Sequence, residues 1–187
     1  MEEKTREVKM LPNNPSRAVM RRVILGLLKL GSSISAYILL PLLMSVAIFD
    51  IIGRKFANVG STQLQELQWH FFFASVMLSI GYTYISDGHV RIDVLRNRFS
   101  PKLRKRIEIL GCVFAVIPLS ILLIWAGGDQ AWRALLSGER SAAALGLENR
   151  WIIKSAVPIG GVLLLLSGIY AGWKNFIALR QLSSDGK

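Results

Sequence analysis

Cysteine and histidine are scarce in this chain, and each shortage excludes a kind of chemistry. The 187 residues include one cysteine, Cys112, and two histidines, His70 and His89. A single cysteine excludes an intrachain disulfide framework and any multi-cysteine zinc or iron–sulfur site. Paired catalytic carboxylates, a Ser–His–Asp set and a phosphate-binding glycine loop are absent from the sequence as well. We therefore predict no catalytic residue, no cofactor-binding residue and no metal ligand in this chain, and no enzymatic activity.

Charged residues are missing from four long stretches, although the whole chain has 23 Lys and Arg against 12 Asp and Glu, a net charge of +11. The charge-free stretches are residues 30–49, 67–86, 109–128 and 155–173. A helix of 20 residues spans about 30 Å, the thickness of the hydrocarbon core of a bilayer. Backbone groups in lipid must be hydrogen-bonded within their own segment, so we expect helices. The sequence predicts an all-α integral membrane protein with four transmembrane helices, and this segregation of charge argues against nucleic-acid binding.

Basic residues are distributed unevenly between these stretches, and the imbalance predicts an orientation. Residues 1–29, 87–108 and 174–187 together contain 17 Lys and Arg. Residues 50–66 and 129–154 contain six. Because basic loops stay in the cytoplasm, both termini are predicted to be cytoplasmic.

The domain organisation follows from this topology. We expect a single four-helix membrane domain over residues 17–182, with a disordered cytoplasmic tail at 1–16 and a short cytoplasmic tail at 183–187. The first apolar stretch follows a long basic segment and shows no small-x-small cleavage pattern. We therefore expect it to be a retained span rather than a cleaved signal peptide.

The segments that lead into the first and third spans contain helix signals. Residues 17–29 are amphipathic, which predicts an interfacial helix against anionic headgroups. The alternative is a flexible basic tail that extends the span by one turn. Ser100 as N-cap and Pro101 at the first helical position predict the start of the third helix, which we expect to continue as far as Ser137. Residues 87–95 alternate polar and apolar side chains, and they fit either a short helix or an extended segment.

Prolines and small residues within the spans indicate how the helices pack. The prolines that permit kinks are Pro41, Pro118 and Pro158. Small residues at four-residue spacing let helices approach closely, and two such pairs occur, Ser75 with Ser79 and Gly168 with Gly172.

Ionisable residues lie at the ends of the predicted spans. A transporter that works alone usually needs an ionisable or unwound site at mid-membrane, and the four stretches offer no charged side chain. Asp50 and Glu66 are the nearest acids, and Asp50 can pair with Arg54 at i+4. His70 and His89 fall on opposite sides of the predicted membrane, which argues against a haem between helices. The residues favour an accessory or scaffold membrane protein.

Several short motifs support a more specific reading. Phe49 to Arg54 closes the first predicted helix, and Leu64 to Trp69 opens the second. The other motifs are Gly81-Tyr82-Thr83 with residues 87–95, Gly138 to Ser141, and Pro158 to Gly161. Their order and spacing, over roughly residues 30–180, resemble the small membrane subunit (the Q-type or small permease component) of tripartite ATP-independent periplasmic (TRAP) transporters. The stretch at 87–95 is similar to the family's glycine–His–x–Arg–x–Asp signature.

The resemblance implies a function and partners. A large membrane subunit would contain the substrate and sodium sites, and a periplasmic binding protein would deliver an organic anion, often a carboxylate. This chain would be a scaffold subunit in the bacterial inner membrane, without a cofactor of its own. Sodium coupling would belong to the large subunit.

The resemblance also suggests candidate contact residues. Arg54, Glu66 and Trp69 would contribute to a subunit or outer-rim contact, and Arg91 and Asp93 would lock the inner loop. Each has a local alternative: Glu66 as an acid in the first turn of a helix, Trp69 as a membrane-interface anchor, and Arg91 with Asp93 as solvated charges. Many relatives have two adjacent acids before the tryptophan, whereas Glu66 follows a glutamine here.

Two other functions stay open at this point. A self-sufficient transporter made of two copies of this chain predicts transport without a further subunit. A membrane anchor for a redox enzyme predicts haem absorbance and requires paired histidines.

Overall fold

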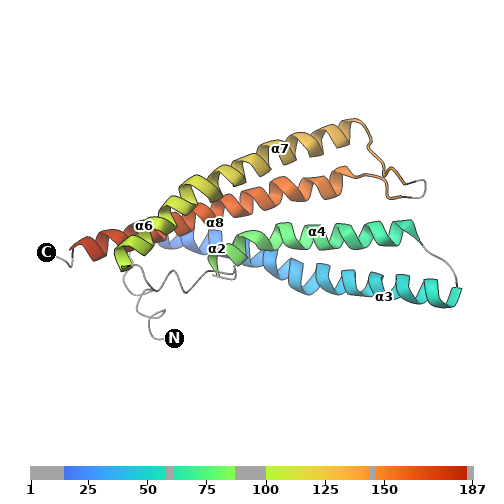
Figure 1. Ribbon diagram of the computed structural model, residues 1–187, viewed down its shortest axis with the longest axis horizontal. Helices are drawn as coiled ribbons and strands as arrows, with labels where there is room; N and C mark the ends of the chain where they lie inside the picture. Colours follow the sequence, from blue (N-terminus) through green and yellow to red (C-terminus); the bar gives the residue numbers. More distant parts are fainter. Residues whose placement is uncertain (1–14, 58–60, 87–99, 144–145, 185–187) are drawn as a thin grey trace.

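The computed structural model describes residues 15–57, 61–86, 100–143 and 146–184, which are helical apart from short connections (Figure 1). The elements in chain order are α2 (Pro15–Ile34), the π-helical turn η1 (Ser35–Leu39), α3 (Leu40–Ala57), α4 (Thr62–Ile85), α6 (Pro101–Gly111), the π-helical turn η2 (Cys112–Val116), α7 (Ile117–Leu136) and α8 (Trp151–Ser184). No strand occurs in the described residues. The predicted all-α class is confirmed.

Three helices are long and apolar enough to cross a membrane. They are Val19–Phe56, Lys102–Leu136 and Trp151–Leu182. Each contains one of the charge-free stretches of the sequence. α4, which contains nearly all of residues 67–86, is not among the three, because polar side chains near its two ends, such as Gln68 and Thr83, reduce its apolar character.

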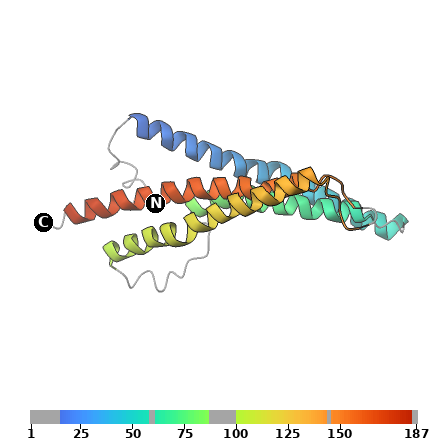
Figure 2. The same cartoon turned by 90° about the horizontal axis from the view of Figure 1, so that it is seen from above.

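The amphipathic segment before the first span is helical, but it is not a separate element. α2 begins at Pro15, two residues before the expected start, and continues through η1 into α3. The 43 residues of this continuous helix span about 64 Å, roughly twice the hydrocarbon thickness of a bilayer. Towards its N-terminus α2 diverges from α8 and α6 (Figure 2). Its placement against headgroups stays a prediction, and residues 1–14 of the expected tail lie outside the described residues.

Two of the three prolines follow a π-helical turn at the same distance. η1 ends two residues before Pro41, and η2 ends two residues before Pro118. A proline has no N–H, and its ring clashes with the carbonyl four residues earlier. The wider π turn makes room for the ring and explains why the helix continues on either side of it. Pro158 lies inside α8 without a π turn.

α8 is the helix around which the others assemble. It packs against α7, α4, α6 and α2, whereas α3 packs mainly against α4. A Cβ atom on Gly81 of α4 would lie 2.6 Å from the carbonyl oxygen of Leu163, and one on Gly160 of α8 would lie 2.9 Å from that of Met77. Only glycine permits backbones to approach this closely, so these two residues set the distance between α4 and α8.

The predicted pairs of small residues lie at helix contacts. A Cβ atom on Gly168 would lie 2.9 Å from Val116 Cγ1 of η2, and Gly172 faces the neighbouring Cys112. The carbonyl oxygen of Ser75 accepts hydrogen bonds from Ser35 Oγ across the interface and from Ser79 Oγ, both at 2.8 Å.

Several polar side chains are buried while many large apolar side chains are exposed, a distribution unlike that of a water-soluble protein. The buried polar residues are Ser35, Asp50, Ser75, Ser120 and Ser167. The two last-named serines donate to carbonyl oxygens of their own helix at 2.6 and 2.7 Å. On α3 the buried residue is Asp50, while eight large apolar side chains of that helix are exposed. An apolar surface of this extent is covered by lipid or by other membrane helices, which supports a membrane location.

The ends of the helix that runs from α6 through η2 to α7 are as predicted. Ser100 Oγ accepts a hydrogen bond from the Leu103 N–H at 3.3 Å, and Pro101 follows it at the first helical position. The helix ends at Leu136 with Ser137 as its C-cap. Residues 87–99 lie outside the described residues, so the conformation of 87–95 stays open.

Candidate functional site

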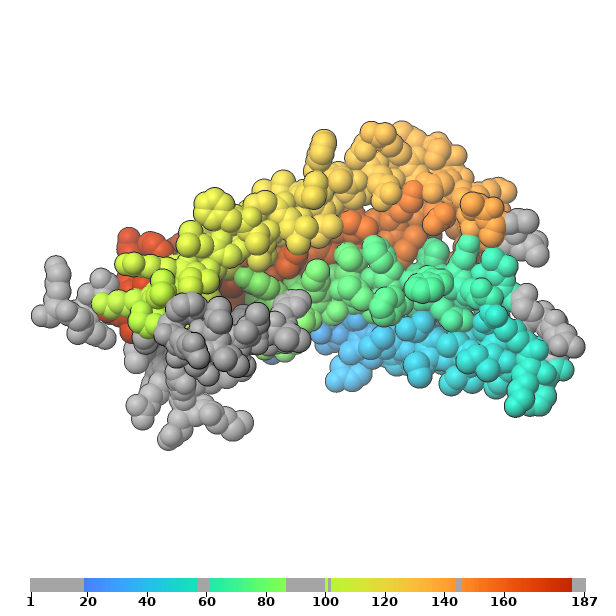
Figure 3. All heavy atoms as spheres, viewed as in Figure 1, coloured from blue at the N-terminus to red at the C-terminus, as the bar shows by residue number. Residues whose placement is uncertain are grey.

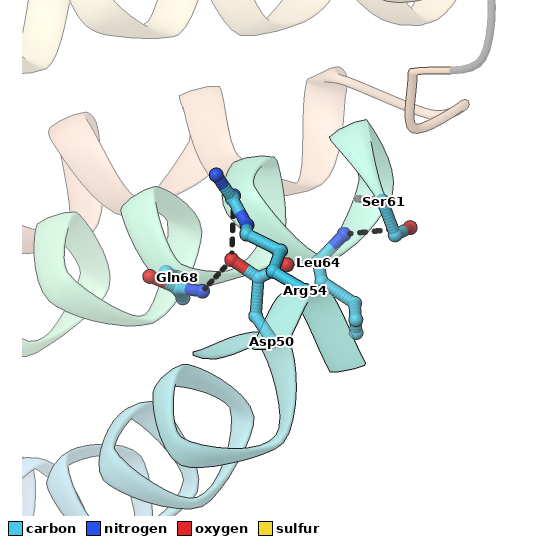
Figure 4. Close-up of polar contacts among 5 residues, drawn as sticks. All are labelled: Asp50, Arg54, Ser61, Leu64 and Gln68. Carbon is cyan, nitrogen blue, oxygen red and sulfur yellow. Dashed lines mark hydrogen bonds and ion pairs between the residues drawn. The ribbon is translucent and has the colours of Figure 1, made fainter. Parts of the chain in front are cut away.

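The densest polar contacts lie at the end of the molecule where α3 and α7 finish and α4 and α8 begin, which we call the distal end. Asp50 in the last turns of α3 is 5% exposed. Its Oδ2 accepts a hydrogen bond from Arg54 at 2.7 Å and lies 3.5 Å from Gln68 Nε2 of α4 (Figure 4). The predicted i+4 pair of Asp50 and Arg54 is confirmed, and the carboxylate also joins two helices.

The second oxygen of the Asp50 carboxylate differs from the first. Oδ1 is buried and accepts no hydrogen bond from the described residues. Arg54, by contrast, has 47% of its side chain exposed, so part of its guanidinium is open to a further partner. An ion pair with one exposed member contributes about 1 kcal/mol or less, which makes a positioning role more important than a stabilising one.

Ser61 explains why α4 begins before the apolar stretch that it contains. Its backbone is extended, and its Oγ accepts a hydrogen bond from the Leu64 N–H at 3.4 Å, the arrangement of an N-cap (Figure 4). The cap adds a turn and a half of polar helix ahead of residue 67. Glu66 and Gln68 are thereby presented on a rigid element rather than on a loop.

Glu66 holds the connection between α7 and α8 against α4. Its Oε1 accepts a short hydrogen bond from Ser141 Oγ, and its Oε2 accepts one from the Leu147 N–H at 2.7 Å. Ser141 and Leu147 are themselves joined by a backbone hydrogen bond of 3.1 Å. A Cβ atom on Gly146 would lie 2.9 Å from Glu66 Oε1, so a glycine is needed beside the carboxylate.

These contacts also affect the proton affinity of Glu66. The Ser141 hydroxyl, the Leu147 N–H and the nearby Arg150 charge favour the carboxylate and hold the pKa of Glu66 below its ordinary value of 4.5, against the opposing effect of burial. Glu66 is therefore ionised at neutral pH. Glu66 does more than act as an acid in the first turn of its helix, because its side chain also binds the connection between α7 and α8.

The rest of the connection is fixed by its own polar contacts. Lys154 Nζ donates to Glu139 Oε2 at 2.5 Å, and the Arg150 N–H donates to the Glu139 carbonyl at 3.2 Å. Gly138 has a φ of 58°, in the left-handed region, where the chain leaves α7. The connection is thus a tight cap over the helix ends.

Trp69 lies away from these contacts. Its side chain is 72% exposed on α4, whereas Arg54 and Glu66 face the contacts at the distal end. The structure therefore brings two of the predicted contact residues to one end of the molecule and leaves Trp69 on the outer surface. Arg91 and Asp93 lie outside the described residues, and their predicted locking role stays a prediction.

Sequence reasoning missed the partners of these residues. Gln68, Ser141 and the Leu147 N–H were not identified as contacts, although Ser141 belongs to a motif of the predicted outer loop. Contacts at i+4 can be read from spacing, but those between Glu66 and Ser141 join residues 75 positions apart. No local pattern signals such a pair.

The acidic and histidine side chains described at the distal end are engaged with neighbouring protein groups. Among the described residues, no group of three or more His, Cys, Asp and Glu side chains could hold a metal ion. His70 Nδ1 lies 2.6 Å from the Glu66 carbonyl oxygen of its own helix, which is a local contact. The site can position helices and a connection, and it offers exposed groups such as Arg54 to a further protein.

A second set of contacts joins helices at the opposite end. Lys105 Nζ donates to Asn175 Oδ1 at 3.0 Å and lies 3.6 Å from Glu108, which ties α6 to α8. Tyr84 Oη and Cys112 Sγ are 3.1 Å apart, which ties α4 to η2. Cys112 is buried.

Comparison with known families gives one match that covers most of the chain. Residues 43–177 match the family described as the DctQ component of tripartite ATP-independent periplasmic transporters. The matched range begins in α3 and ends in the last turns of α8, so it includes both sides of the distal end. No curated protein matches the chain.

Proposed function

Because the chain belongs to the DctQ family of tripartite ATP-independent periplasmic transporters, we propose that it is a four-span scaffold subunit of such a transporter. DctQ proteins are the small permease components, so the chain is a transporter subunit and not an enzyme. Transporters of this kind combine a small and a large membrane subunit with a periplasmic binding protein. We propose that the large subunit performs sodium-coupled uptake of an organic anion, a carboxylate by the family's default, with this chain as its support.

The length and packing of α4 support a fourth span. Its 24 residues extend about 36 Å, enough to cross the hydrocarbon core. α4 lies alongside α3 and α8, and its exposed side chains include Phe72 and Val76. A helix enclosed between two membrane-crossing neighbours has no route to water along its middle, so we propose that it crosses with them.

The distribution of basic residues supports cytoplasmic termini in the inner membrane. The starts of α2 and α6 and the end of α8 lie at one end of the molecule, and the ends of α3 and α7 lie at the other (Figure 1). Seventeen of the 23 Lys and Arg fall in the sequence segments 1–29, 87–108 and 174–187, which include the starts of α2 and α6 and the end of α8. Basic segments are retained in the cytoplasm, which favours the N-in, C-in orientation.

The observation that carries the scaffold role is the inverted distribution of polarity, together with the family match. Among the described residues the interior holds four serines and one aspartate beside a few apolar side chains such as Leu28 and Leu164, while most large apolar side chains are exposed. Residues 30–49, 67–86, 109–128 and 155–173 contain no Asp, Glu, Lys or Arg, so the chain offers no charged side chain at mid-membrane to bind an ion or an anion. It does have a large apolar surface for another membrane protein.

Co-expression tests the proposal. The full chain is produced together with the large membrane subunit, purified in detergent and reconstituted in liposomes with the binding protein. We expect the two membrane chains to co-purify, and uptake to require both of them and a sodium gradient. Liposomes prepared without this chain are the matched control. Equal uptake without this chain, or its purification free of any large subunit, would contradict the proposal.

A further inference from the structure

The two π-helical turns place two aromatic side chains in equivalent positions. Tyr37 is the third residue of η1, and Phe114 is the third residue of η2. Tyr37 is 80% exposed and Phe114 is 76% exposed. The first residue of each turn is buried, and a proline follows each turn after two residues. The two exposed aromatic side chains differ in one hydroxyl group.

Tyr37 lies deep in its span. Tyr37 is eight residues from Lys29, about 12 Å along the helix, and near the centre of the charge-free stretch 30–49. The neighbouring Ser35 bonds to Ser75, which lies in the middle of α4. The level of Tyr37 is therefore close to the middle of the membrane-crossing part of the molecule.

The Tyr37 hydroxyl indicates what covers the exposed side of η1, which we call the Tyr37 face. Among the described residues, the Tyr37 hydroxyl has no hydrogen-bond partner. Lipid tails offer no acceptor, and an unpaired hydroxyl in hydrocarbon is costly. The Phe114 side of its helix has no such group at this level: Leu110, one turn before Phe114, and Ile121, two turns after it, are exposed aliphatic side chains. Lipid suits the Phe114 face, whereas the Tyr37 face requires a surface that can accept a hydrogen bond.

The Tyr37 face is also continuous and accessible. Exposed side chains follow Tyr37 along one stripe of α3, at Pro41, Met44, Ile48 and Ile51. α3 and α7 lie at opposite edges of the molecule in the view of Figure 1, so a partner on one edge leaves the other free (Figure 3). Arg54, with its exposed guanidinium, lies at the distal end of the same helix.

We infer that helices of the large membrane subunit dock on the stripe from Tyr37 to Ile51, where the Tyr37 hydroxyl donates to a polar group of that subunit, and that the Phe114 face contacts lipid. This inference rests on the proposed function for the existence of the large subunit. The inference specifies that the large subunit covers the Tyr37 face and not the Phe114 face.

Photo-crosslinking tests the inference in the co-expressed complex. Tyr37 and Phe114 are replaced one at a time by p-benzoylphenylalanine, which fits both positions because both side chains are exposed aromatics. We expect irradiation to join position 37 to the large subunit and position 114 to no protein. Crosslinking from position 114 alone, equal crosslinking from both, or crosslinking of position 37 to a second copy of this chain or to nothing would overturn the inference while co-purification still upheld the proposed function. If the wild-type chain does not co-purify with the large subunit, both fall.

The substitution Tyr37→Phe tests the hydroxyl alone. We expect it to weaken the association of the two subunits about threefold to tenfold, the effect of one lost hydrogen bond. Phe114→Leu is the control and should leave the association unchanged. Both variants should keep the helix content and elution volume of the wild-type chain. An unchanged association in Tyr37→Phe would exclude the proposed hydrogen bond.

Discussion

The continuous helices α2–α3 and α6–α7 each contain a π-helical turn before a proline, yet the two turns are held in different ways. η1 begins at Ser35, whose hydroxyl donates to the Ser75 carbonyl of α4. η2 begins at Cys112, whose sulfur lies beside the Tyr84 hydroxyl of the same helix α4. Sulfur is a weaker hydrogen-bonding atom than a hydroxyl oxygen. Both helices accommodate their proline with a π-helical turn. The turn η1 is held to α4 by a strong hydrogen bond, and η2 is held to α4 by a weak one.

The packing beside the two turns differs in the same direction. A Cβ atom on Gly31, one turn before η1, would lie 2.8 Å from the Leu78 carbonyl oxygen. A Cβ atom on Gly168 would meet the Cγ1 methyl group of Val116 in η2 at 2.9 Å. A backbone carbonyl in a helix cannot move aside, whereas a methyl group can shift with its side chain. We call α2, η1, α3 and α4 the first half of the molecule and α6, η2, α7 and α8 the second half. Added side-chain volume beside η1 should therefore destabilise the protein more than added volume beside η2.

Glycine substitutions test this difference most strongly. We expect Gly31→Ala to lower the free energy of unfolding by about 1–3 kcal/mol, because the new methyl group forces two helix backbones apart. Gly168→Ala should cost less than about 1 kcal/mol, since Val116 can adjust. Thermal unfolding of the purified protein in detergent measures both. Gly26→Ala is the control, because nothing lies within 4 Å of the added atom. An equal or larger loss at Gly168 would show that the two turns are packed alike.

Exchanging the first residues of the turns has a smaller expected effect. Ser35→Cys replaces a strong donor by a weak one, and we expect a loss of about 0.5–1.5 kcal/mol in the free energy of unfolding. Cys112→Ser provides a hydroxyl beside Tyr84 and should cost less than Ser35→Cys. Unfolding in detergent is again the measurement, with the double exchange as the control for additivity. A larger loss in Cys112→Ser would reverse our ranking of the two contacts.

Much of this architecture could be predicted from the sequence, and the exceptions have a common cause. The cap at Ser100, the end near Ser137 and the pair of Asp50 with Arg54 depend on residues within four positions of each other, and all three are confirmed. The continuity of residues 17–29 with the first span was missed because Lys29 marks the start of the charge-free stretch 30–49 without interrupting the helix.

The π-helical turns and the contacts of Glu66 were missed for a related reason. A proline indicates where a helix is distorted but not whether the distortion is a kink or a π-helical turn. Pro41 therefore predicted a kink and gave no sign of η1. The contact of Glu66 with Ser141 depends on how α4 packs beside the connection from α7 to α8, which is a property of the assembled helices. Spacing along the chain contains no information about it.

Glu66 is where the two halves join, since it belongs to α4 and binds the connection from α7 to α8. We expect Glu66→Gln to open that connection locally while global unfolding changes little, because an amide loses the charge that strengthens both hydrogen bonds. Hydrogen exchange of the amides at 139–147 is the measurement, and faster exchange is expected for the Leu147 N–H. Glu148→Gln is a matched control in the same connection, because Glu148 is exposed and pairs only with Arg140 among the described residues.

Acidification should have the same effect as Glu66→Gln, and the direction follows from linkage. The folded-state pKa of Glu66 lies below its ordinary value of 4.5, so the contribution of the carboxylate is fully present above that value and is lost as pH falls through the lower, folded-state pKa. Exchange at Leu147 should therefore accelerate in acid in the wild-type chain and in Glu148→Gln, and should respond much less in Glu66→Gln. If acid opens the connection equally in Glu66→Gln, another group controls it, and the halves are joined by helix packing at Gly81 and Gly160 rather than by this carboxylate.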